Sequence, residues 1–201
     1  MVKDHTQDKE FIHMVLGHHF GIQPSMNYLL EYCAKVSESI AWRKISELDF
    51  EKDVKHIQNW LKKTVTTQPP QEFIQAFWFG LSNPALNDGE TSCDLYVSGS
   101  IHFDANDPTG AWTHLDPTFY LPKSCYAQSV ILDEIYYLIH HYEVVDPGEY
   151  MLCLGYAGLA VKSACSQIEK HLLYGFSGPR PIAVGFDNGD FIHIERYLTD
   201  Q

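Results

Sequence analysis

The spacing of apolar residues changes once along the chain, and this change limits the fold more than any other feature. Between residues 11 and 65 apolar side chains recur every three or four positions, which is typical of helices buried along one side. From residue 73 the runs FIQAFWFGLS and DLYVSGSIHFD have the character of strands, and the second alternates strictly. We therefore expect an α+β fold, with helices packed against an antiparallel sheet built from at least two β-hairpins.

Two pairs of strands account for this expected sheet. The runs at residues 73–82 and 94–104 are joined by the turn-rich stretch NPALNDGE. Near the C-terminus, Asn188-Gly189 separates two apolar runs, and both residues tolerate the positive φ of a type I′ turn. In the register set by such a two-residue turn, Phe186 opposes Phe191 and Val184 opposes His193.

Further helices are expected at residues 127–142 and 149–173. The second includes YMLCLGYAGLAV, whose small residues permit close approach of neighbouring backbones, so it is expected to lie at the centre of the core. A chain of 201 residues is long enough to bury roughly 70% of its unfolded surface. We expect one globular domain over residues 1–201, in which residues 1–65 can form a helical subdomain and residues 71–201 the α+β core.

The cysteines and the hydropathy pattern indicate a cytoplasmic protein. Five cysteines are present, an odd number without CxxC spacing, and no basic and apolar leader precedes them. This pattern favours reduced thiols. No run approaches 18 consecutive apolar residues, so a membrane span is not expected.

Negative charge is concentrated in the middle of the chain. The formal net charge is -12, and residues 71–160 hold only Lys123 against twelve acidic residues. Such a field repels phosphate groups, so nucleic-acid binding is disfavoured, whereas a basic protein, a cationic ligand or metal ions would be attracted. The alternative is that the charge serves solubility alone.

A partner surface is the first hypothesis for the polar side of the strand at residues 94–104. Leu95, Val97 and Gly99 fall on its apolar side, which leaves carboxylates, hydroxyls and an imidazole on the expected wet side. Trp112, in the following loop, is a candidate exposed anchor, although partial burial under that loop is the alternative. The candidate partner-binding residues are Asp94, Tyr96, His102, Asp104, Asp107, Trp112 and Asp116.

A metal site in the loop DANDPTGAW is the second hypothesis, and the spacing argues against it. In an EF-hand beginning at Asp104, Pro108 and Thr109 would occupy the positions that need an oxygen ligand and a turn glycine. No HExxH motif or zinc-type Cys/His pair is present. The same residue types are those of an ordinary turn, so neither a metal nor any other cofactor is expected.

Cys125 is the best nucleophile in the sequence and carries the enzyme alternative. It precedes an expected helix, whose N-terminal dipole would lower a thiol pKa, and His102 or His193 on a strand would be the base. The alternative is therefore a cysteine-dependent hydrolase. The local sequence KSCYAQS matches no such family, and GxSxG, GxGxxG and Walker A motifs are absent.

In class, the chain resembles the small acidic immunity proteins of bacterial polymorphic-toxin systems. The resemblance rests on the expected α+β chain, the charge of residues 71–160, the stretches DLYVSGS and AVGFDNGDFI, and the absence of a catalytic set. It implies a non-catalytic antitoxin that binds a cognate toxin, often a basic nuclease. An acidic face would steer such a partner and raise its association rate roughly 10- to 1,000-fold at low salt.

Overall fold

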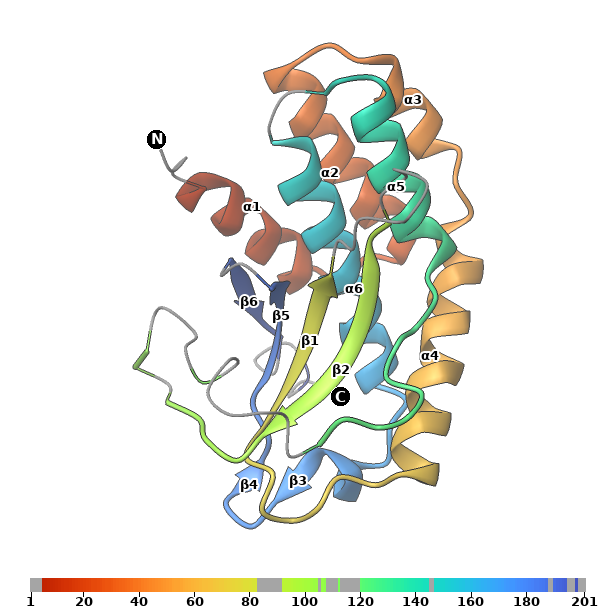
Figure 1. Ribbon diagram of the computed structural model, residues 1–201. Coiled ribbons are helices and arrows are strands. Elements are labelled where there is room, and N and C mark those ends of the chain that lie inside the picture. The colour runs from red at the N-terminus through yellow and green to blue at the C-terminus, as the bar shows by residue number, and fades with distance from the viewer. Residues whose placement is uncertain are drawn as a thin grey trace.

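Helices and strands follow one another in distinct blocks along the computed structural model (Figure 1). The structure describes residues 5–82, 92–104, 106–107, 112, 120–144, 147–187, 190–194 and 198. The N-terminal block contains α1 (Thr6–Gly17), α2 (Ile22–Val36), α3 (Ile40–Ser46) and α4 (Phe50–Thr67). Two strands follow, β1 (Ala76–Ser82) and β2 (Asp94–Ser100), and then α5 (Val130–His141), the π-helical turn η2 (Tyr150–Leu154) and α6 (Gly155–Cys165). The chain continues through the 3₁₀ turn η3 (Lys170–Leu173), β3 (Tyr174–Gly175), β4 (Gly178–Pro179), β5 (Ile182–Phe186) and β6 (Phe191–His193).

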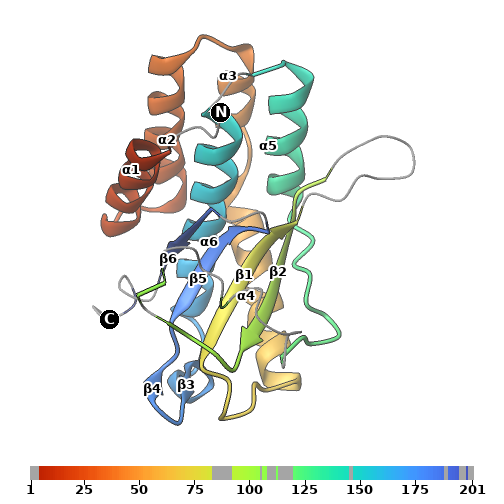
Figure 2. The same ribbon diagram turned by 60° about the vertical axis from the view of Figure 1, so that its left-hand side comes forward.

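The main sheet has the strand order β2-β1-β5-β6 and is mixed rather than wholly antiparallel (Figure 2). The α+β class is confirmed, and β1 pairs with β2, and β5 with β6, in antiparallel fashion. The two pairs are joined by a parallel pairing of β1 with β5 that the sequence did not predict. After β2 the chain passes through α5 and α6 and then re-enters the sheet as β5, which runs parallel to β1.

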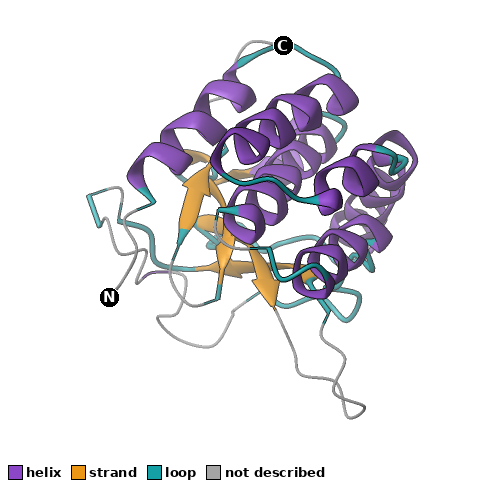
Figure 3. Ribbon diagram, turned by 90° about the horizontal axis from the view of Figure 1, so that it is seen from above, coloured by secondary structure: helices purple, strands orange, loops and turns teal. Residues whose placement is uncertain are grey.

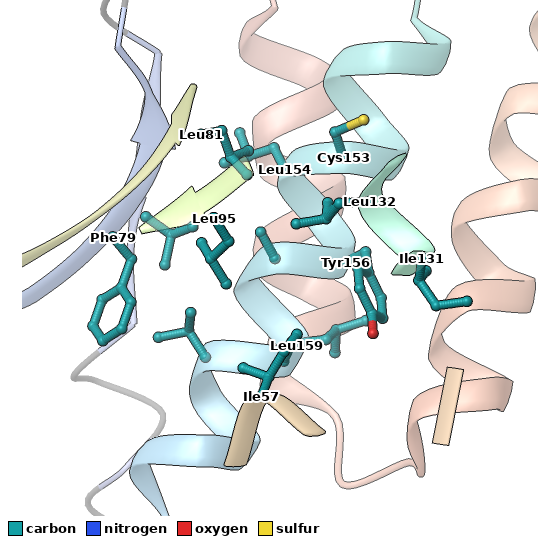
Figure 4. Close-up of a cluster of buried hydrophobic side chains, with 14 of the residues drawn as sticks. Ile57, Phe79, Leu81, Leu95, Ile131, Leu132, Cys153, Leu154, Tyr156 and Leu159 are labelled. Atoms are coloured by element: carbon teal, nitrogen blue, oxygen red, sulfur yellow. The ribbon is translucent and has the colours of Figure 1, made fainter. Parts of the chain in front are cut away.

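The helices cover one face of the sheet, and the main core fills the space between the two layers (Figure 3). Figure 4 labels Phe79, Leu81 and Leu95 on the strands, close to Leu154 and Leu159 of η2 and α6. One continuous cluster of buried residues extends from Ile12 to Ile194. Residues 1–65 therefore share their core with the sheet. Within the described part of the chain, no helix is both long and apolar enough to cross a membrane.

The expected central helix is buried as predicted, but it is shorter. Every residue of α6 from Gly155 to Val161 is buried, and the helix ends at Cys165 rather than near residue 173. A Cβ atom at Gly155 would lie 2.5 Å from Leu29 Cδ1, and one at Gly158 would lie 2.8 Å from Ile192 Cδ1. Glycine at these positions therefore allows α6 to touch both α2 and the sheet.

The register of the β5–β6 pair differs by one residue from the predicted one. Val184 pairs with Ile192, and Ala183 pairs with His193. Because opposed residues share a face of a sheet, this register directs Val184 and Ile192 together into the main core, whereas the predicted one would have placed His193 beside Val184. The backbone N–H of Phe186 donates to Asp190 O at 2.9 Å. Three residues, 187–189, therefore lie between Phe186 and Asp190, instead of the two-residue turn expected. Positions 188 and 189 lie outside the described residues.

Candidate functional site

The predicted row of polar side chains at residues 94–104 is divided between the two ends of β2. The strand ends at Ser100, so Asp94 and Tyr96 lie at its start, while His102 and Asp104 lie beyond its end. Ser100 lies six positions after Asp94, which in a strand is a distance of about 20 Å. The prediction of one continuous strand surface over residues 94–104 is therefore wrong.

The face of the sheet opposite the helices is partly covered by aromatic side chains rather than exposed to solvent. Trp78 of β1 and Trp112 meet edge to face, with 6.5 Å between ring centroids, and Phe103 packs against Trp112 at 5.2 Å. Trp112 is only 2% exposed, so its predicted role as an exposed anchor is wrong. Ser98, predicted on the wet side of β2, is also buried because it lies on this covered face.

His102, Asp104 and Asp107 surround a shallow pocket of about 350 Å³ that Gln75, Phe103 and Trp112 also line. His102 and Asp104 are exposed, and the turn is held by Asp104 Oδ1, which accepts from Asn106 N at 2.9 Å. Among the described residues, no group of three or more His, Cys, Asp and Glu side chains is placed to hold a metal ion. Asp116 lies outside the described residues.

Tyr96 links three strands near the other end of β2. Its hydroxyl donates to Asp187 Oδ1 at 2.6 Å and accepts from Trp78 Nε1 at 3.1 Å. Gly80 makes this arrangement possible, because a Cβ atom there would collide with the Tyr96 ring. Burial, together with the hydrogen bond and negative charge of Asp187, raises the pKa of Tyr96, so the hydroxyl remains a donor at neutral pH.

One further tyrosine and two further carboxylates extend this group. The ring of Tyr126, which is 50% exposed, lies 5.8 Å from the Tyr96 ring. Burial raises the pKa of Tyr126, and the charges of Asp94 and Asp187 raise it further. The charge of Asp94 also contributes, after burial, to the raised pKa of Asp133 at the start of α5. We call this set the tyrosine–carboxylate patch: Asp94, Tyr96, Tyr126, Asp133 and Asp187.

Exposed apolar groups continue the patch along α5. Tyr137 follows Asp133 by four residues, so both lie on one side of the helix, and Tyr137 is exposed. Val130 precedes Asp133 by three residues and is also exposed. Val130 is therefore not part of the buried side of α5, although it is apolar. Tyrosine rings beside carboxylates are suited to bind a protein surface rich in Lys and Arg.

Sequence reasoning found Asp94 and Tyr96 but missed Tyr126, Asp133 and Asp187. These three come from the strand-like segment beside β2, from the start of α5 and from the end of β5. The concentration of charge in residues 71–160 pointed to Asp133 without distinguishing it from the other acidic residues. Nothing local marked Asp187, because its proximity to Tyr96 depends on the parallel pairing of β1 with β5.

Cys125 does not lie in a catalytic arrangement with either predicted histidine. It lies in the segment that borders β2, where Cys125 O accepts from Val97 N at 2.9 Å. His193 is on β6 at the other edge of the sheet, roughly 19 Å away at the usual strand spacing. His102 lies beyond the far end of β2.

The surroundings of the Cys125 thiol also disfavour a nucleophile. Cys125 is buried, and burial raises its pKa, which stabilises the protonated thiol. The residue that caps α5 is Ser129, so Cys125 lies four residues before the cap, outside the reach of the helix dipole. The expectation that a helix N-terminus activates Cys125 is therefore wrong.

No protein-family model, curated protein or solved structure matches this chain.

Proposed function

We propose that this protein is a non-catalytic binding protein that neutralises a basic toxin domain, and that the tyrosine–carboxylate patch is its contact surface. One observation carries the proposal: exposed Tyr126 lies near Asp94 and Asp187, and Asp133 lies near Asp94. All of these except Asp187 belong to residues 71–160, whose only Lys or Arg is Lys123. Tyrosine supplies a large contact area, and the carboxylates supply charge complementarity to Lys and Arg.

The electrostatics of the patch favour a cationic partner. Burial raises the pKa of Asp94, and burial and neighbouring negative charge raise that of Asp133, so ionising these groups in the free protein is unfavourable. A Lys or Arg from a partner would remove part of that cost by pairing with them. Binding would therefore weaken as pH falls through the raised pKa values of Asp94 and Asp133.

The neighbouring genes give the first test of the antitoxin assignment. An immunity protein is expected to be encoded next to a toxin-like reading frame with a basic C-terminal domain. Co-expression of that domain with this chain should restore cell growth and yield a complex of the two proteins. A neighbouring set of metabolic genes, or unrestored growth, would contradict the assignment.

Single charge reversals would then locate the contact surface. Asp94→Lys should weaken the complex more than tenfold, because it replaces attraction by repulsion at a desolvated contact. Asp104→Lys makes the same change beyond the other end of β2, and Glu169→Lys makes it at an exposed position beside η3. Both should retain near-normal affinity. If Asp104→Lys weakens the complex and Asp94→Lys does not, the contact lies at the shallow pocket instead of the patch.

A further inference from the structure

Arg180, between β4 and β5, is a buried cation. It is only 3% exposed, and its guanidinium donates to three backbone carbonyls: Nε to Ile74 O at 2.9 Å, Nη1 to Leu172 O at 3.0 Å, and Nη2 to Gln71 O at 2.9 Å. A guanidinium carries five N–H bonds, so two remain after these contacts.

No described carboxylate forms an ion pair with this guanidinium. The ring of Phe77 lies beside it, with its centroid 5.5 Å from Cζ. Glu72 is close enough for its charge to favour the protonated guanidinium, but burial has the larger effect and lowers the pKa of Arg180. Buried charges are normally paired with an opposite charge, and among the described residues Arg180 has no such contact partner.

Arg180 borders a pocket of about 340 Å³ with aromatic walls. Phe73, Phe103 and Phe176 line it, and Phe176, in the turn between β3 and β4, is 77% exposed. Ile74 and Gly175 line the same pocket, and a Cβ atom at Gly175 would lie 3.4 Å from Arg180 Nε. The same Cβ atom would lie 2.9 Å from Ile74 O and 3.1 Å from Glu72 O, so glycine at this position allows β3 to lie against the backbone that also accepts from Arg180.

We propose that this pocket binds a carboxylate that carries an aromatic group, with the anion beside Arg180 and the ring against Phe73, Phe103 and Phe176. The remaining N–H bonds of Arg180 provide charge-assisted donors, and the exposed phenyl rings provide the apolar contact. The carboxylate can belong to a free aromatic acid or to the C-terminus of a peptide ending in an aromatic residue. This site is separate from the tyrosine–carboxylate patch and does not depend on the antitoxin function.

Titration of the whole protein with a matched pair of probes tests this recognition. We expect 3-phenylpropionate to bind at least about tenfold more tightly than 3-phenylpropanamide, because only the acid offers a negative charge to Arg180. NMR spectra of the amide protons should place the largest changes at Gly175, Phe176 and Arg180. Equal binding of acid and amide, no binding of either, or changes confined to other residues would overturn the proposal.

Two substitutions at exposed positions of the pocket should change the affinity for 3-phenylpropionate in opposite directions. If Arg180 only stabilised the fold, neither substitution would change this affinity. Glu72→Gln removes a negative charge beside the pocket, so it should tighten the binding of 3-phenylpropionate about two- to fivefold. Phe176→Ala removes part of the apolar wall and should weaken it about tenfold. Phe20→Ala is the control at another exposed phenylalanine, outside the pocket, and should leave the affinity unchanged. Unchanged affinity in both pocket variants would overturn the proposal.

The dipeptide Ala-Phe, with a free or an amidated C-terminus, distinguishes the two sources of the carboxylate. Tighter binding of the free-acid dipeptide than of 3-phenylpropionate would identify a peptide C-terminus as the ligand. Binding of 3-phenylpropionate without binding of the dipeptide would identify a small aromatic acid. Dipeptide binding that is unaffected by amidation would overturn the proposed role of Arg180.

Discussion

At the level of single residues, the thiols give the sharpest test of the enzyme alternative. All five cysteines are buried, and burial raises the pKa of Cys125, so we expect slow labelling of all five by iodoacetamide in the native protein near pH 7. Mass spectrometry of labelled peptides measures each rate, and labelling in urea is the control for reagent activity. Labelling of Cys125 much faster than the other four would restore it as a nucleophile.

The raised pKa of Asp94 predicts how the free energy of unfolding depends on pH. Burial raises its pKa above the ordinary 3.8, in opposition to a hydrogen bond from Ser92 that lowers it. The folded state therefore binds this proton more tightly than the unfolded state. Protonated Asp94 favours folding, and this contribution to stability is lost as pH rises through the pKa of Asp94 in the folded state. Asp94→Asn, which stays neutral, should raise the free energy of unfolding at pH 7, and this gain should vanish near pH 3. Urea unfolding at both pH values measures it, with Glu169→Gln as the control. A gain that persists at pH 3 would contradict this explanation.

At the level of elements, one buried carboxylate joins three helices. Asp53 of α4 accepts from Ser129 Oγ at 2.6 Å and from Val130 N at 3.2 Å at the start of α5, and from Tyr156 OH of α6 at 2.7 Å. Asp53→Ala would leave these donors unpaired in the interior, so we expect a loss of about 3 kcal/mol in the free energy of unfolding. Glu51→Ala, at an exposed site on the same turn, should cost under about 1 kcal/mol. Equal losses in urea unfolding would show that Asp53 does not hold the helices together.

At the level of the whole molecule, the net charge of -12 predicts how association depends on salt. If the field steers a basic partner, raising NaCl from about 10 mM to 500 mM should slow association tenfold or more and change dissociation much less. Stopped-flow measurements with the co-expressed toxin domain separate the two rates. Association that is independent of salt would mean that the charge serves solubility rather than partner binding.

Local patterns in the sequence were sufficient to predict most helices and the existence of the strands. One start signal is local: Asp49 is the N-cap of α4, and its side chain accepts from Lys52 N at 3.1 Å. Gly21 follows an apolar helical run and so looks like the end of that helix, yet it is the N-cap of α2. Such boundaries are less certain from sequence because a glycine can cap either end of a helix.

The sequence by itself determined the α+β class, the burial of α6 and the concentration of charge, because periodicity and composition depend on residues close together in the chain. The tertiary structure alone decided the parallel pairing of β1 with β5, the β5–β6 register and the burial of Trp112. It also decided that Tyr126 and Asp187 lie beside Tyr96 and that Asp133 lies near Asp94. These features depend on which side chains share the core and on which segments meet across the sheet, and contacts between residues far apart in the chain leave no local pattern in the sequence.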